Sequence, residues 1–192
     1  MEFSSKKHKD IVSTAKALFW KYGFKRVTIE EVCATAKVSK MTFYKFYPNK
    51  LELAKAVFDM VVDDGVERFK LLMGSDAPVS EKMRGMIQMK LEGTNDISRE
   101  FLADFYANPE LGLSAYIEEK TRVVWADVIT IFREGQQKGW FRSDFKPELL
   151  LILAQKAAEL VTDSKVVALY NKPQDLVLEL TSLMTYGIVN HD

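Results

Sequence analysis

Residues 28–53 read TIEEVCATAKVSKMTFYKFYPNKLEL, and this stretch decides the fold. Thr28 stands before an apolar-periodic run and has Glu31 three residues later, the pair that forms a capping box at a helix start. Ser39 restarts the pattern and opens a second helix of about two turns, which must end before Pro48 because proline disfavours helix at the preceding residue. The sequence therefore predicts two short helices that meet at a tight turn, as in a helix-turn-helix.

The second short helix carries polar side chains that a helical core would not need. At helical spacing Phe43 can face inward with Val38 and Phe46, which leaves the side chains between them free to project outward. In a helix-turn-helix the second helix enters the major groove of DNA. We expect base contacts from Ser39, Lys40, Thr42 and Lys45, and phosphate contacts from Thr28, Tyr44, Tyr47 and Lys50. The alternative for Tyr44 and Tyr47 is packing in an amphipathic core, and it is stronger for Tyr47.

Helical periodicity continues through the rest of the chain. Before the quoted stretch, apolar residues recur at helical spacing from Ile11 up to Gly23, where a first helix is predicted to end. After it, we predict helices at 48–73, 80–93, 98–107, 109–138, 147–161 and 174–188. No segment has a persuasive strand pattern, so we predict an all-α protein of about nine helices. We expect a head in residues 1–50 and a helical body in residues 51–192.

Charge is divided unevenly between these two parts. The 192-residue chain is neutral overall, with 27 basic and 27 acidic side chains. Residues 1–50 nevertheless hold 11 Lys and Arg against 4 Asp and Glu, a balance of +7, and the remainder carries −7. A basic head on an acidic body attracts a polyanion such as DNA at one end only. A solvated basic face on an ordinary helical domain is the alternative explanation.

Other function classes find little support. His8 and His191 lie near the two ends of the chain, and adjacent carboxylates such as Glu118 and Glu119 point to different sides of a helix. Catalysis and metal binding need groups that converge, so we expect no enzyme activity, metal site or cofactor. The single cysteine, Cys33, is predicted to be a packed thiol. No run approaches the ~18 apolar residues of a membrane span and no signal sequence is recognisable, so we expect a cytoplasmic protein.

In the first quarter of the chain, many well-separated residues match the pattern of a known family in register and without gaps. These residues are Ile11, Ala15, Leu18, Phe19, Gly23, Thr28, Ile29, Val32, Ala36, Val38, Ser39, Lys40, Thr42, Tyr44, Tyr47, Asn49, Lys50 and Leu53. In these positions the chain resembles the TetR family of bacterial transcription regulators. Two positions depart from the family pattern, which usually has glycine where this chain has Lys37 in the turn and Met41 in the second helix. A left-handed backbone at Lys37 would carry a strain of order 1 kcal/mol. Met41 would place a thioether where the backbone normally approaches DNA.

Two helices near the C-terminus suggest an interface between subunits. Residues 149–153 are apolar around the whole helix and continue into the small residues Ala154, Ala157 and Ala158, which indicates burial on more than one side. The final helix carries a matching stripe. We predict a two-fold four-helix interface, which would pair two heads about one DNA turn apart on a palindrome. The alternative is simple core packing. The expected interface residues are Leu150, Leu153, Ala154, Ala157, Leu176, Leu180, Leu183 and Met184.

Methionines and aromatic residues gather in the middle helices, which suits an adaptable apolar pocket. Plain core is the alternative, and the resemblance to TetR proteins favours an effector site. The expected ligand-binding residues are Met86, Met89, Phe101, Phe105, Tyr106, Tyr116, Trp125 and Phe132. An effector would bind the DNA-incompetent arrangement more tightly and swing the helix at 48–73. The lack of a buried charge constellation favours a neutral or amphipathic molecule.

These features together predict a DNA-binding transcription regulator, expected to be a repressor. It would bind a palindromic operator as a homodimer and be released by a small, largely apolar effector. Two alternatives stay open. A helical protein-interaction module without DNA activity would explain the periodicity but not the helix of Lys, Thr and Tyr. A helical enzyme has less support, because no catalytic group has a partner.

Overall fold

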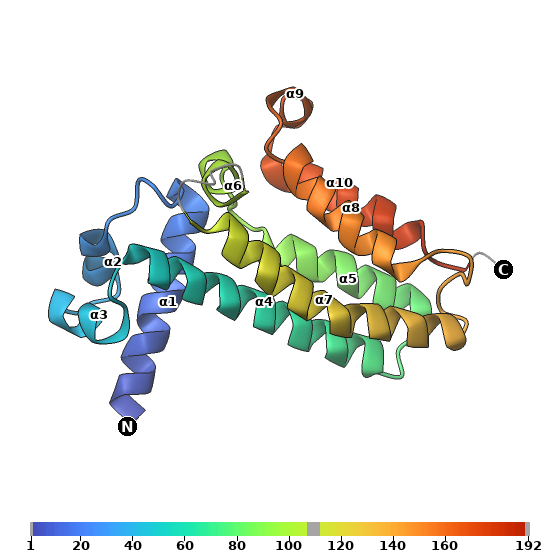
Figure 1. Cartoon of the computed structure of the whole chain (residues 1–192), viewed down its shortest axis with the longest axis horizontal. Helices are drawn as coiled ribbons and strands as arrows, with labels where there is room; N and C mark the ends of the chain where they lie inside the picture. The colour runs from blue at the N-terminus through green and yellow to red at the C-terminus, as the bar shows by residue number, and fades with distance from the viewer. Residues whose placement is uncertain (1, 107–111, 191–192) are drawn as a thin grey trace. The chain divides into compact units, whose positions relative to one another are not determined.

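The computed structural model describes residues 2–106 and 112–190, with side chains from Lys6 onward except that of Ala158. Within these ranges the chain forms ten helices and no strand, and a lone antiparallel bridge joins Phe141 to Val189. Figure 1 traces the helices along the chain. The all-α prediction is therefore confirmed. The additional helix is α9 (Ser164–Val167), whose single turn is too short to show an apolar period.

Two compact units make up the chain. Unit 1 comprises residues 1–61 and 96–117, and unit 2 comprises residues 62–95 and 118–192. These units differ from the expected division at residue 50, because the long helix α4 (Lys50–Gly74) contributes to both and α6 packs against α1. The division into residues 1–50 and 51–192 follows function rather than packing, and it stays a prediction.

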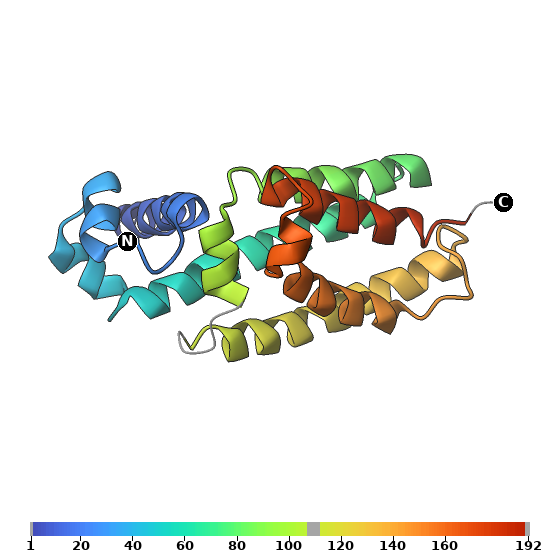
Figure 2. The same cartoon turned by 90° about the horizontal axis from the view of Figure 1, so that it is seen from above.

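Unit 1 is built around its first helix. It contains α1 (Glu2–Tyr22), α2 (Ile29–Thr35), α3 (Lys40–Phe46), the first part of α4, α6 (Arg99–Tyr106) and the first turn of α7 (Ser114–Gln137). Helix α1 packs against α2 and α6, and α2 packs against α3 (Figure 2). The predicted boundary between the helices at 98–107 and 109–138 lies outside the described residues. The buried core of this unit includes Ile11, Ala15, Phe19, Val32, Phe43, Leu53 and Val57.

Aromatic rings join α6 to α1. The ring centroids of Trp20 and Phe101 lie 4.2 Å apart, and the ring of Phe105 lies near those of Phe19 and Phe24. The backbone N–H of Ser98 donates to the carbonyl of Trp20 at 2.8 Å. This bond satisfies one of the carbonyls that the last turn of a helix leaves without a partner. Helix α6 is thus part of the same core as the helix-turn-helix.

Unit 2 is a second helical core. It contains the rest of α4 and of α7, α5 (Val79–Gly93), α8 (Pro147–Leu160), α9 and α10 (Pro173–Tyr186). Helix α10 lies along α5 and also contacts α8 (Figure 2). Its buried cluster is Phe69, Met73, Met83, Phe132, Phe141, Phe145, Leu150 and Ile188. None of the helices in the described ranges combines the length and apolar character that crossing a bilayer requires.

A buried lysine closes the turn between α4 and α5. Lys82 is 1% exposed, and its ammonium donates to the carbonyls of Leu72 and Met73, both at 3.1 Å, and of Ser75 at 2.5 Å. These carbonyls belong to the end of α4, where a cation also interacts favourably with the helix dipole. The charge of Lys82 is therefore used inside the unit.

The start of α4 differs from the prediction. The sequence predicts Pro48 in the first turn of this helix, but the helix begins at Lys50. Asn49 provides the cap, because its Oδ1 accepts a hydrogen bond from the backbone N–H of Glu52 at 2.9 Å. Pro48 lies outside the helix, in the short connection that follows α3.

Candidate nucleic-acid interface

Side-chain caps build the two short helices as predicted. The N–H of Glu31 donates to Oγ1 of Thr28 at 3.1 Å, and the N–H of Thr28 donates to Oε2 of Glu31 at 2.8 Å. This reciprocal pair is the capping box of α2. Ser39 caps α3, because its Oγ accepts from the N–H of Thr42 at 3.1 Å. The hydroxyl groups thus fix where both helices begin.

The turn between α2 and α3 contains a left-handed lysine. Lys37 has φ of 55°, a backbone conformation that favours glycine. Its side chain is exposed, and the adjacent Val38 N–H donates to the carbonyl of Cys33 at 3.0 Å. Cys33 itself is buried beneath this turn, and burial raises the pKa of its thiol. The packed-thiol prediction for Cys33 is confirmed.

Helix α3 has one buried face and one exposed face. Phe43 is completely buried, with Val38 and Phe46 partly buried beside it. The exposed side chains are those of Lys40, Met41, Tyr44 and Lys45, and Thr42 is partly exposed. Met41 is 71% exposed, which puts its thioether on the outer surface of the helix. The outward face that the sequence predicted is therefore present.

A carboxylate from α2 reaches the first residue of α3. Glu30 forms an ion pair with Lys40, and both side chains are more than half exposed. The hydrogen bond from Lys40 lowers the pKa of the Glu30 carboxyl, and the same bond raises the pKa of Lys40. One of the lysines expected to contact bases is thus paired within the head.

Tyr47 is packed rather than exposed. Its Oη lies 2.6 Å from Nε2 of His8, and the two rings stack with centroids 5.6 Å apart. The His8 ring also meets the edge of Phe46. Burial raises the pKa of Tyr47 to about 12. Tyr47 is therefore packed in the head, which is the alternative to a phosphate contact. Its hydroxyl nevertheless lies close to the end of α3.

Lys50 points into the head. Its ammonium donates to the carbonyls of Phe24 at 2.8 Å, Val27 at 2.9 Å and Lys25 at 3.3 Å. It also lies over the Phe24 ring, 4.4 Å from the centroid. Of the residues expected at phosphates, Tyr44 and Thr28 are exposed, with the Thr28 hydroxyl used in the capping box.

Two residues of this surface could not be predicted from the sequence. Glu30 pairs with Lys40 across a turn, and His8 meets Tyr47 from a helix 39 positions away. The sequence shows that Glu30 is acidic, but its pairing with Lys40 depends on the packing of α2 against α3. His8 had no signal beyond its place on the polar side of the first helix.

The helix-turn-helix matches a known sequence family. Residues 11–57, which run from α1 into α4, match bacterial regulatory proteins of the tetR family. The chain therefore carries a helix-turn-helix segment of the tetR type. Over 130 residues it is 29% identical to the HTH-type transcriptional regulator RutR of Escherichia coli K12, an alignment that covers 62% of this chain. The chain thereby spans about 61% of the length of that curated relative.

Solved structures share the fold over nearly the whole chain. The fatty acid degradation regulator FadR from Bacillus halodurans has a TM-score of 0.67 at 20% identity, covering 94% of this chain and 95% of that protein. NemR of E. coli in its reduced form has a TM-score of 0.68 at 16% identity, covering 97% and 99%. At these identities the likeness shows the TetR fold alone.

The residues expected to bind an effector are distributed over both units of the chain. In unit 1, Phe101 and Phe105 are buried in the contact of α6 with α1, and the hydroxyl of Tyr116 donates to Oδ2 of Asp59 at 2.6 Å. Tyr106 is exposed. In unit 2, Phe132 is part of the buried cluster, and Met86, Met89 and Trp125 pack against it.

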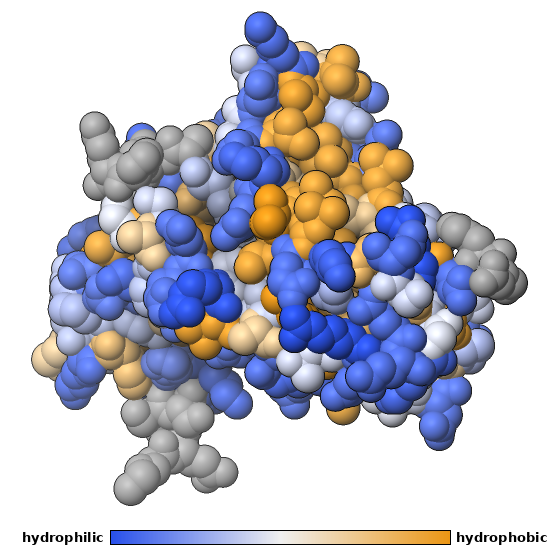
Figure 3. Space-filling model, turned by 45° about the vertical axis from the view of Figure 1, so that its right-hand side comes forward, coloured by the Kyte–Doolittle hydropathy of each residue, from blue (hydrophilic) through white to orange (hydrophobic). Residues whose placement is uncertain are grey.

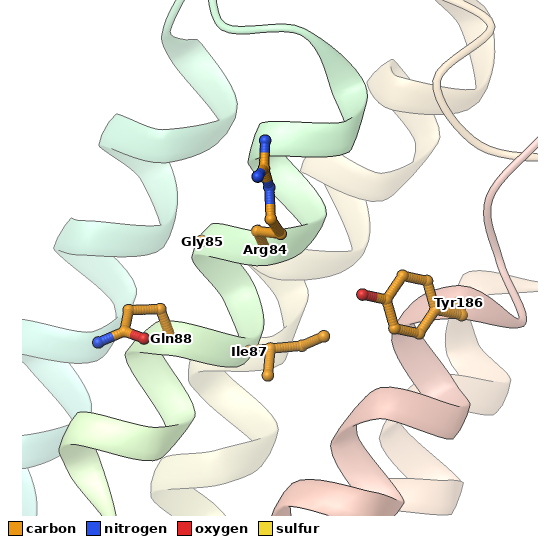
Figure 4. Close-up of a pocket in the computed structure, with 5 residues that line it drawn as sticks. All are labelled: Arg84, Gly85, Ile87, Gln88 and Tyr186. Carbon is orange, nitrogen blue, oxygen red and sulfur yellow. The ribbon is translucent and has the colours of Figure 1, made fainter.

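A shallow pocket of about 510 Å³ lies between α5 and α10 in unit 2. It is lined by Arg84, Gly85, Ile87, Gln88 and Tyr186 (Figure 4). Ile87 and Tyr186 point toward each other from the two helices, whereas Gln88 points away. A second pocket, of about 350 Å³, lies between α4 and α7. Neither pocket is lined by any of the eight expected effector residues.

The residues expected at a dimer interface fall into two groups. Leu150 and Leu176 are buried within unit 2 itself, so they serve its core. Leu153 and Leu183 are exposed, and Ala154, Ala157, Leu180 and Met184 are partly exposed. Leu149, Ile152 and Tyr186 are also exposed, although they are not among the expected interface residues. Periodicity could not choose the outer face of α8, because its residues 149–154 form an unbroken apolar run.

Proposed function

We propose that the chain is a transcription regulator that binds double-stranded operator DNA as a homodimer. In this proposal it represses transcription by binding a palindromic operator, and a small, largely apolar effector releases it from the DNA. The observation that carries the proposal is the outer face of α3, where buried Phe43 holds Lys40, Thr42, Tyr44 and Lys45 toward solvent. An α-helix fits the major groove of B-DNA, and side chains on its outer face reach base edges there.

The exposed side chains of α3 suit distinct roles at DNA. Lys45 has no hydrogen-bond or ion-pair partner within the part of the chain that the structure describes, and an ammonium suits the guanine acceptors. The methyl group of Thr42 suits the thymine methyl, and the Tyr44 hydroxyl suits a phosphate. Ser39 and Thr42 share a contact of 3.0 Å between their hydroxyls, which leaves acceptor capacity for a base or water.

An exposed apolar face supports the proposed homodimer. Leu149 stands about one turn before Ile152 and Leu153 on α8, and all three are exposed. Leu183 and Tyr186 on α10 are exposed as well. Figure 3 shows hydrophobic side chains gathered over the α8–α9 part of the surface. Large exposed apolar patches are uncommon on monomers and mark interaction surfaces. A two-fold axis would cover this face with its own copy.

The proposed effector is the part that rests most on the family resemblance. Met86, Met89 and Trp125 are only partly buried around the unit 2 core, so their flexible and aromatic surfaces have room to contact a small apolar molecule. Release follows if that molecule binds a DNA-incompetent arrangement more tightly than the DNA-competent one. The direct test measures displacement of a labelled operator by a panel of neutral apolar molecules. A molecule that binds the chain without changing operator affinity would contradict the proposed release.

Selection from a random pool of duplexes tests the DNA proposal. The wild type should enrich one sequence with two-fold symmetry and bind it far more tightly than scrambled DNA of equal length. The variant Lys45→Ala should weaken this preference, because it removes the ammonium group proposed to contact a base edge. Enrichment of no sequence, even at low salt, would leave the protein-interaction alternative as the better account.

Sedimentation equilibrium tests the homodimer. The wild type should sediment as a dimer at micromolar concentration, and Ile152→Glu should shift it to monomer by burying a charge in the contact. Leu71→Glu is the matched control, because Leu71 is also a large exposed apolar residue but lies on α4. A monomeric wild type would contradict the proposal.

A further inference from the structure

The connection between α1 and α2, residues 23–27, is held from two sides. We name it the head loop. From α6, Oδ2 of Asp104 accepts the backbone N–H of Lys25 at 2.8 Å. From α4, the Lys50 ammonium donates to the carbonyls of Phe24, Val27 and Lys25. A carboxylate thus holds an N–H of the loop while an ammonium holds its carbonyl groups.

The fit around Asp104 is close. Asp104 is 9% exposed, although aspartate is rarely buried without partners. Gly23 has φ of 81°, and a Cβ there would lie 2.9 Å from Oδ2 of Asp104 and 3.0 Å from Cβ of Glu100. The carboxylate can therefore reach the head loop only because residue 23 has no side chain. This contact is specific to the backbone path of the loop.

Lys50 has no hydrogen-bonding capacity left over. An ammonium group has three N–H donors, and three loop carbonyls lie within 3.3 Å of Nζ. The Phe24 ring covers another side of the group. Burial lowers the pKa of Lys50, while the nearby Asp104 and Glu31 act in the opposite direction. A lysine in this setting is a structural cross-link.

The head loop leads directly into the DNA-reading helices. It ends at Val27, and Thr28 is the cap of α2, which packs against α3. We propose that Lys50 and Asp104 are a positioning pair, which fixes the head loop and thereby the place of α2 and α3 on α1. Lys50 acts in this way and does not neutralise a phosphate. The inference rests on the proposed DNA binding.

The salt dependence of DNA binding separates positioning from phosphate contact for Lys50. The duplex is the one that the wild type enriches from the random pool. Lys50→Met should lower affinity by about tenfold, because a cross-link made of charged hydrogen bonds is lost. The slope of log affinity against log salt should stay that of the wild type. Lys45→Ala is the positive control, since loss of an exposed ammonium from the proposed DNA-reading face reduces counterion release and should reduce the slope by up to about 0.9. An equal reduction for Lys50→Met would overturn the inference.

Asp104 is tested by two substitutions. Asp104→Asn keeps an oxygen that can accept the Lys25 N–H, and we expect an affinity within about twofold of the wild type. Asp104→Ala removes the acceptor, and we expect a loss of about tenfold with an unchanged salt slope. Glu100→Ala is the matched control, because it removes a carboxylate from the same helix without touching the loop N–H. Circular dichroism confirms that each variant is folded at the temperature of the titration.

Hydrogen exchange at the Lys25 amide gives a second measurement. Asp104→Ala should raise its exchange rate, and Asp104→Asn should do so much less. A folded Asp104→Ala protein that binds the selected duplex as the wild type does would overturn the positioning role. Failure of the wild type to prefer any duplex is a different result, because it defeats the proposed function itself.

Discussion

The hydroxyl oxygen of Tyr47 lies 2.6 Å from Nε2 of His8, which ties the residue that ends α3 to the N-terminal part of α1. The ring contacts of His8 with Tyr47 and Phe46 add to this bond. The exposed end of α1 is thereby fixed beside the helix that we propose to read DNA. The nearby Lys6 and Lys9 are exposed there, so the same contact holds additional positive charge close to α3.

Tyr47 should make the protein sensitive to strongly alkaline pH. Its pKa is raised by burial to about 12, above that of an unfolded tyrosine near 10. The stabilisation is therefore complete below about pH 10 and is lost as pH rises toward 12, by at most ~3 kcal/mol. Urea unfolding between pH 9 and 12 measures this change. Tyr47→Phe should reduce this decline in unfolding free energy, whereas Tyr44→Phe, at an exposed position, should not. Equal declines in the wild type and both variants would contradict the assignment to Tyr47.

Replacing Lys37 by glycine should stabilise the head. The left-handed backbone at φ 55° strains a lysine, whereas glycine adopts it freely. After the greater entropy loss of glycine is subtracted, we expect a net gain of about 0.5–1 kcal/mol in the free energy of unfolding. Thermal melting measures it. Asp96, with φ of 58°, is the comparison, because aspartate tolerates this conformation better and Asp96→Gly should gain less. A Lys37→Gly protein less stable than the wild type would contradict the proposed backbone strain at Lys37.

Replacing Glu30 by glutamine should strengthen DNA binding. Glu30 holds Lys40 in an ion pair and adds a negative charge beside the proposed DNA surface. Its removal frees Lys40 for a phosphate or base, so affinity should rise several-fold and the salt slope should steepen by up to about 0.9. Fluorescence anisotropy at several salt concentrations measures both. Glu119→Gln, which breaks a similar pair with Arg122 on α7, should change neither. Weaker binding by Glu30→Gln would show that Glu30 positions Lys40 productively.

Replacing Lys82 by methionine should destabilise unit 2. The substitution keeps the length of the buried side chain but leaves the carbonyls at the end of α4 without their charged donor. We expect a loss of about 2–3 kcal/mol in unfolding free energy. Lys138→Met is the matched control, because both ammonium groups lie 4.6 Å from the Trp140 ring centroid but Lys138 is exposed. Equal losses in the two variants would assign the effect to the ring contact.

Local features of the head could be predicted from the sequence. The caps at Thr28 and Ser39 depend on partners three residues away, so a reading of neighbouring residues was sufficient. The left-handed backbone at Lys37 agrees with the family resemblance, in which glycine is usual at this position. The inward position of Phe43 followed from helical spacing alone.

Long-range features could not be predicted in the same way. The bond between Asp104 and the N–H of Lys25 joins residues 79 positions apart, and the path of Lys50 depends on where the head loop passes α4. A single lysine at a helix start gives no signal that distinguishes an internal cross-link from a phosphate contact. The outer face of α8 could not be predicted either, because the unbroken apolar run at residues 149–154 has no period from which to choose between Leu150 and Ile152.

The exposed apolar face of α8 has a consequence for gene dosage. In the homodimer that we propose, this face is covered only when two chains meet, so at low abundance the number of paired heads grows with the square of the amount of protein. Doubling expression of a scarce chain would then nearly quadruple the occupied operators. Dilution at cell division would lower occupancy more steeply than it lowers the protein itself, which makes the switch sensitive to growth rate as well as to small molecules.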